Sequence, residues 1–191
     1  MQNANVPNPS SGAEPAVKPA HLLRADDWQF EYRQKSNPAN SNLDLLTYGV
    51  YRVAPGASSD ELFHRNEEAL LFCMASEPLI VEVDGQAYSM AHYDTLYVSM
   101  ATPYRIQNPT GEIQSLVVCR APAENRHPVF HSVWNEFRTN EARIRHLDGK
   151  DVFLMFDVTE GADRLMAGYT IYEPYTRAWP PHNHTHQEEI Y

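Results

Sequence analysis

From Trp28 onward, short apolar runs alternate with turn residues, which is the pattern of an all-β chain. The runs with the length and composition of strands are residues 46–53, 69–74, 79–83, 93–98, 104–108 and 113–120. In the third run, every second residue from Leu79 to Val83 is apolar, and Asp84-Gly85 follows as a two-residue hairpin signal. The series contains no strand–helix–strand alternation. It therefore predicts a closed or sandwiched antiparallel fold of about eight strands, such as a double-sheet jelly roll.

The pattern changes after this series. Residues 123–151 are rich in His, Arg, Glu and Asn, and they predict a linker with one short helix. A second β pattern then covers residues 152–158, a polar turn at Glu160–Asp163, and residues 165–172. Residues 1–20 carry four prolines and almost no large apolar side chain, which indicates a disordered lead-in. The predicted organisation is a lead-in at 1–20, a β-domain at 21–122, a linker at 123–151 and the start of a second β-domain at 152–191.

Composition narrows the possible partners. Apolar residues make up 42% of the 191 residues and charged residues 21%, which is enough for a packed core. The net charge of -10 argues against binding to nucleic acid or to an anionic membrane surface. No apolar run reaches the roughly 20 residues that span a bilayer, and the N-terminus has no apolar core of a secretory signal. Two cysteines within apolar runs favour free thiols and a cytoplasmic location.

The candidate chemistry lies in residues 180–191. His182 and His184 are two residues apart, so in an extended strand both side chains point to the same face. Glu189 has the opposite parity and needs a turn or bulge to join them. Two imidazoles and a carboxylate suit Zn, Mn, Fe or Ni. The segment therefore predicts a divalent-metal site with His182, His184 and Glu189 as ligands, while a solvated His-rich tail is the alternative reading.

Residues around this motif resemble the first signature of the cupin superfamily, in which a Gly precedes His-x-His and a Glu; Gly168 is the matching Gly. The first β-domain resembles the same superfamily less completely. It has His64 with Glu67-Glu68 in the first signature, and Tyr104 stands where a metal-binding cupin has His. One His and one Tyr make a poor divalent-metal site. The first domain is therefore expected to be a metal-free cupin, with His64 and Tyr104 as interior groups.

From Tyr48 to Tyr191 the chain resembles the double-cupin sugar-acid isomerases of the KduI/IolB type, which comprise 5-keto-4-deoxyuronate isomerase and 5-deoxyglucuronate isomerase. The segments that carry the resemblance are residues 81–88, 92–98, 119–123 and 180–191. It implies an all-β cupin fold, a double-stranded β-helix or jelly-roll barrel followed by the first strands of a second cupin. It also implies Zn²⁺ on His182, His184 and Glu189, with a chain that ends inside the second cupin. The family's fourth ligand, a His of the second signature, has no counterpart in this sequence.

The resemblance implies aldose–ketose isomerisation of a sugar acid, either 5-deoxyglucuronate in inositol catabolism or 5-keto-4-deoxyuronate in uronate catabolism. A positioned acid and base would move a proton through an enediol, and His186 and Glu188 are the nearest candidates. Both could equally be exposed rim residues. Fold does not determine function, so two alternatives stay open. The chain could be another metal enzyme, such as a dioxygenase, or a non-catalytic cupin that binds a sugar or a partner. A sugar-acid substrate and a homo-oligomer are expected, since an incomplete second barrel exposes strand edges.

Overall fold

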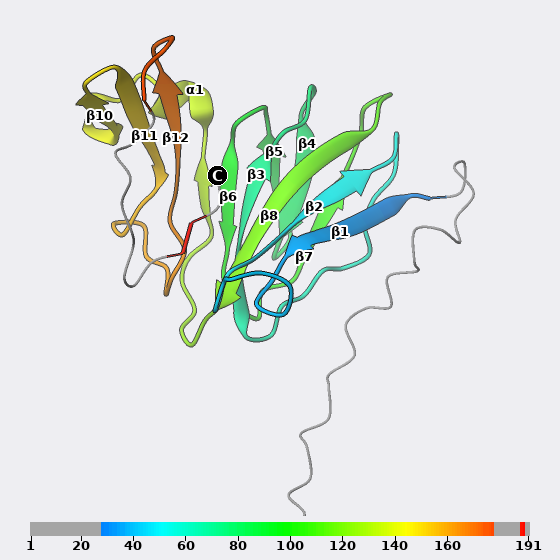
Figure 1. The fold of residues 1–191 in the computed structure, drawn as a ribbon. Helices are drawn as coiled ribbons and strands as arrows, with labels where there is room; N and C mark the ends of the chain where they lie inside the picture. Colours follow the sequence, from blue (N-terminus) through cyan, green and yellow to red (C-terminus); the bar gives the residue numbers. More distant parts are fainter. Residues whose placement is uncertain (1–27, 178–187, 190–191) are drawn as a thin grey trace, which may run out of the picture.

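The computed structural model describes residues 28–177 and 188–189, and it is mostly β (Figure 1). The strands are β1 (Phe30–Ser36), β2 (Thr47–Val53), β3 (Glu67–Cys73), β4 (Leu79–Val83), β5 (Gln86–Met90), β6 (Thr95–Val98), β7 (Tyr104–Gln107), β8 (Gln114–Pro122), β9 (Phe130–Ser132), β10 (Ile144–Leu147), β11 (Lys150–Phe156) and β12 (Ala167–Tyr172). Two short helices, α1 (Trp134–Phe137) and the 3₁₀ turn η2 (Glu141–Arg143), lie between β9 and β10. In this described part, no helix has the length and apolar character needed to cross a membrane.

Two sheets enclose one apolar core. The larger sheet has the order β1-β2-β8-β3-β6-β9 and the smaller has the order β5-β4-β7. Alternate residues of β2 and β8 are buried, as expected when one face of an antiparallel sheet covers a core. Side chains from both sheets meet there, among them Leu71, Val81 and Leu116, which are fully buried. We call this double sheet the first barrel, and it confirms the predicted jelly roll.

The hairpin between β4 and β5 shows how local sequence determines the register. Asp84 and Gly85 both have positive φ, at 48° and 78°. A two-residue turn with this geometry matches the right-handed twist of the flanking strands. Val83 and Gln86 are paired directly before and after it. The hairpin predicted from Asp84-Gly85 is thereby confirmed.

A third sheet, β10-β11-β12, packs beside the first barrel (Figure 1). One contact is made by Phe156 on β11, whose ring stacks on Tyr97 of β6 with centroids 4.7 Å apart and an interplanar angle of 12°. Leu70, Ala121 and Leu165 complete this second apolar cluster. The segment predicted as a linker contains β9, which pairs with β6, and the α1 helix. The limits of the predicted domains stay a prediction.

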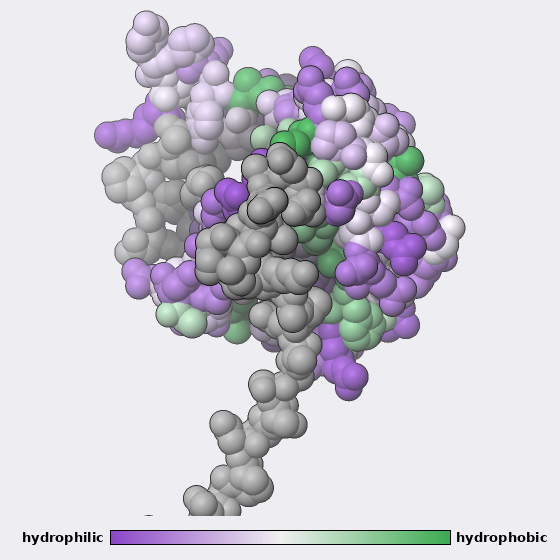
Figure 2. Space-filling view, turned by 90° about the vertical axis from the view of Figure 1, so that its right-hand side faces the viewer, coloured by the Kyte–Doolittle hydropathy of each residue, from purple (hydrophilic) through white to green (hydrophobic). Residues whose placement is uncertain are grey.

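The face of the molecule at the right of Figure 1 carries hydrophilic and hydrophobic residues side by side (Figure 2). Scattered exposed apolar side chains are normal for folded proteins. Elsewhere on the chain, the exposed apolar residues include Val158 in the turn after β11 and Ile171 on β12. The strongest chemical features of the described residues lie instead at buried or half-buried polar groups.

Candidate functional site

The predicted metal ligands are only partly within the described structure. His182 and His184, together with the proton-transfer candidate His186, lie outside the described residues. Glu189 is described, and its side chain is exposed. Within residues 28–177 and 188–189, no three His, Cys, Asp or Glu side chains are placed to hold a metal ion together. The metal site on His182, His184 and Glu189 stays a prediction.

Glu188, the other proton-transfer candidate, binds the loop before β2. Its carboxylate accepts hydrogen bonds from the backbone N–H groups of Asp44, Leu45 and Leu46, the last at 2.7 Å. Although burial acts to raise it, these three donors lower the pKa of Glu188 below its ordinary value. The contact attaches residues 188–189 to the first barrel. A catalytic role for Glu188 stays a prediction.

A chain of hydrogen bonds links side chains inside the first barrel, and it includes residues of both segments that resemble cupin signatures in the first domain. The Nε2 atom of His64 lies 3.0 Å from the hydroxyl of Tyr104, which lies 3.1 Å from the hydroxyl of Tyr51. Arg120 Nη1 lies 3.2 Å from His64 Nδ1. Because a guanidinium only donates, Nδ1 accepts and Nε2 carries the proton. The bonds therefore run from Arg120 through His64 and Tyr104 to Tyr51.

Burial and charge hold this group in one protonation state. Burial, followed by the charge of Arg120, lowers the pKa of His64 to about 4, so the imidazole is neutral near pH 7. Burial raises the pKa of Tyr51 to about 12. Burial acts to lower the pKa of Arg120, but Glu67, 2.9 Å away, raises it above its ordinary value. His64 and Tyr104 are interior groups, as expected, and the His64 lone pair that a metal would use is bonded to Arg120.

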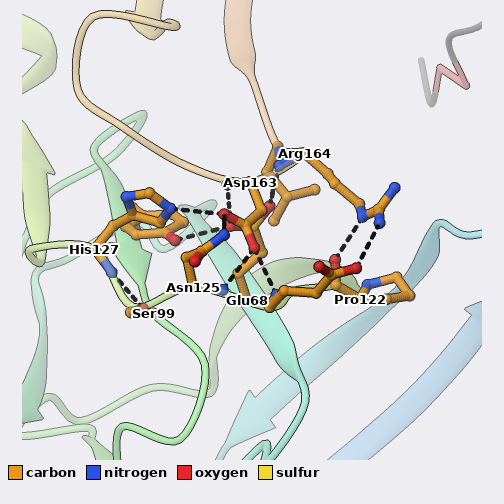
Figure 3. Close-up of polar contacts among 10 residues, drawn as sticks. Glu68, Ser99, Pro122, Asn125, His127, Asp163 and Arg164 are labelled. Carbon is orange, nitrogen blue, oxygen red and sulfur yellow. Dashed lines mark hydrogen bonds and ion pairs between the residues drawn. The ribbon is translucent and has the colours of Figure 1, made fainter.

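A second polar group, shown in Figure 3, joins the first barrel to the third sheet. Glu68 on β3 is fully buried, and its carboxylate accepts a bond from the Tyr97 hydroxyl at 2.8 Å. It also accepts bonds from the backbone N–H groups of Asp163, Arg164 and Leu165 at 2.9, 2.7 and 2.8 Å. One buried carboxylate thus binds three consecutive residues of the β11–β12 connection. Charged acceptors make stronger hydrogen bonds than neutral ones.

Asp163 makes the reciprocal contact (Figure 3). Its carboxylate accepts bonds from the backbone N–H groups of Glu124 and Asn125 at 2.5 and 2.8 Å, and from the Asn125 amide at 3.1 Å. His127 Nε2 lies 2.8 Å from the same carboxylate. The His127 bond, followed by the two backbone bonds, holds the pKa of Asp163 well below its ordinary value. We call Glu68 and Asp163, with the groups they bind, the carboxylate interlock.

Comparisons with known proteins identify the fold. No protein-family model matches the chain, and no curated protein matches it. A solved structure named as a glyoxylate-induced protein from Pseudomonas aeruginosa has a TM-score of 0.60 and 18% identity, over 76% of this chain and 56% of that one. An IolB-like protein from Salmonella typhimurium LT2 has a TM-score of 0.57 and 18% identity, over 71% of this chain and 53% of that one.

The protein Ylba from E. coli is similar over 78% of this chain and 55% of its own, with a TM-score of 0.53 and 9% identity. The fold is a cupin fold. This confirms the all-β cupin architecture predicted from the sequence. The chain spans about half the length of these three proteins.

Proposed function

We propose that this cupin-fold protein takes part in the metal-dependent aldose–ketose isomerisation of a sugar acid. The observation that supports the proposal most is the motif His182-x-His184 with Glu189, in a chain whose fold is that of the cupins. The likeness to an IolB-like protein adds support, because the sequence resembles the double-cupin isomerases in four separate segments. The substrate would be 5-deoxyglucuronate or 5-keto-4-deoxyuronate.

The donor set fits a divalent ion. Two imidazoles and a carboxylate are ligands that Zn²⁺ accepts readily, and Mn, Fe and Ni accept them too. His182, His184 and Glu189 would hold the ion, and the side chain of Glu189 is exposed. The bound ion would supply electrophilic stabilisation of the oxygen that gains negative charge during the reaction.

The protein would supply the proton transfer between the adjacent carbons of the substrate. Of the two candidates, His186 is preferred. Glu188 already accepts bonds from three backbone N–H groups, so using it as a proton carrier would weaken the attachment of residues 188–189 to the loop before β2. Glu188 would then hold the neighbouring ligand Glu189 in position.

The test uses the purified protein, with its metal content measured after purification. We expect about one divalent ion per chain and isomerisation of one of the two sugar acids. His182→Ala should remove both the metal and the activity. Glu188→Gln should retain more bound metal than His182→Ala does, and it should retain part of the activity. A metal-loaded protein that converts neither acid would contradict the isomerase proposal and favour another metal-dependent cupin enzyme.

A further inference from the structure

We propose that the first barrel has its own binding site for a small hydroxy-carboxylic acid, with the guanidinium of Arg120 as the group that binds the carboxylate. This site uses none of the residues of the predicted metal motif. It consists of residues on β1, β2, β3, β7 and β8 and in the connection before β3.

The donors of Arg120 are unequally used. Nη1 donates to His64 Nδ1 at 3.2 Å and to Glu67 Oε2 at 2.9 Å, so both of its protons are engaged. Nη2 has only a long bond of 3.3 Å to the hydroxyl of Tyr32. Within the described part of the chain, no group accepts a bond from the buried Nε. Nε and Nη2 form one edge of the planar guanidinium, and that edge is the partly unused one.

This edge has the geometry that a carboxylate requires. Arginine binds carboxylates through two parallel N–H groups, and such pairs are among the strongest hydrogen-bonded contacts in proteins. A buried N–H without an acceptor is unfavourable, because the group has lost its hydrogen bonds to water and gained none in return. A ligand carboxylate on Nε and Nη2 would satisfy the Nε proton. The Tyr32 hydroxyl occupies the position on Nη2 where one of the two oxygens of the ligand carboxylate would bind.

Tyr32 is the group that would move. It lies on β1, which is an edge strand of the larger sheet, and its ring packs on Tyr51 with centroids 5.0 Å apart. Gly49 on β2 leaves room for the ring, because a Cβ at that position would lie 2.5 Å from Tyr32 Cε2. Because β1 has a neighbouring strand on one side only, the ring can swing towards the open edge, which would exchange its contact with the Arg120 guanidinium, 5.6 Å from the ring centroid, for the ligand carboxylate.

The surroundings favour a ligand that also carries hydroxyl groups. His64, Tyr104 and Tyr51 form one chain of hydrogen bonds from the guanidinium, and the Tyr51 hydroxyl at its end still has a proton to donate to a ligand oxygen. His64 is uncharged near pH 7, and Glu67 is the carboxylate that balances Arg120 through Nη1. The side chains of His64 and Glu67 are 16% and 32% exposed, so the group reaches solvent on their side.

The experiment is a titration of the purified chain with D-glucuronate, monitored by calorimetry and by NMR. D-glucose is the control ligand, because it lacks the carboxylate. Both the wild-type chain and a His182→Ala/His184→Ala variant are titrated, so that binding to a metal on the predicted motif is excluded. We expect saturable binding of D-glucuronate to both proteins and none of D-glucose. Equal binding of both sugars, or no saturable binding of either, would overturn the proposal.

Two variants locate the site. Arg120→Lys keeps the charge but loses the planar pair of donors, so D-glucuronate should bind about tenfold more weakly. Glu67→Gln removes the competing carboxylate and should strengthen binding. If Arg120→Lys fails to fold, as its melting curve would show, Glu67→Gln still decides: unchanged or weaker binding would contradict a site at Arg120. Loss of binding only in the His182→Ala/His184→Ala variant would place the carboxylate at the metal motif and refute this proposal.

Discussion

The first barrel and the third sheet are held in different ways. The barrel core draws fully buried side chains from both of its sheets, including Leu79 and Ile106. The third sheet meets the barrel through a smaller cluster of five buried residues, through ring contacts of Tyr169 with Phe72 and Tyr93, and through the carboxylate interlock. The barrel therefore depends on apolar burial, which has no directional requirement. The third sheet depends on a small apolar cluster together with a few directional contacts, and single substitutions should be able to release it while the barrel stays folded.

The largest expected effect is that of Phe156→Ala. Phe156 is fully buried and stacks on Tyr97, so its removal leaves a cavity between the third sheet and the barrel. Buried Phe→Ala substitutions cost about 3–5 kcal/mol. Hydrogen exchange should become much faster in β11 and β12 and change little in β8. Val158→Ala, at a side chain that is 74% exposed, is the matched control and should alter neither. Equal acceleration in β8 would show that barrel and third sheet unfold as one unit.

A smaller effect is expected from Glu68→Gln, which keeps the shape of the side chain but removes its charge. The amide oxygen can still accept, whereas the NH₂ group faces backbone N–H groups that also donate. Losing hydrogen bonds to a buried charged group should cost about 2–3 kcal/mol. Exchange of the amide protons of residues 163–165 reports the change directly. Glu61→Gln, at an exposed carboxylate, should leave those protons unaffected. If these amide protons were equally protected from exchange in Glu68→Gln and in wild type, Glu68 would not be the group that holds the β11–β12 connection.

The sequence predicts the parts that follow from side-chain patterns. Six strands of the first barrel carry a signal in apolar runs, in alternation and in turn residues, as the Asp84-Gly85 hairpin does, so the jelly roll could be predicted; these are β2, β3, β4, β6, β7 and β8. Strand β9 is only three residues long and half-buried, and no period is visible in it. Its partner β6 decides its place in the sheet, and that pairing has no local signature.

The interlock and the Arg120 group could not be predicted for a different reason. Glu68 and Asp163 bind backbone N–H groups, which every residue except proline carries. The residue types of their partners therefore give no signal in the sequence. In the sequence, Glu67 and Glu68 belong together to one segment that resembles a cupin signature, although their side chains bind separate groups. Arg120 lies in another segment that carries the family resemblance, but its partners His64 and Tyr32 are far from it in the chain. Only tertiary structure brings these groups together.

The smallest expected effect is an acid sensitivity of the other half of the interlock, at Asp163. The pKa of Asp163 is lowered in the folded protein, so its bonds to His127, Glu124 and Asn125 stabilise the fold fully above the ordinary value of 3.8. That contribution is lost as pH falls from 3.8 towards the lower folded pKa. Asp163→Asn should therefore melt below wild type at pH 7, and the difference should shrink as pH falls below 3.8. Asp60→Asn, at an exposed position, should show neither effect. A difference for Asp163→Asn that stayed constant down to low pH would mean that the charge of Asp163 does not hold residues 124–127.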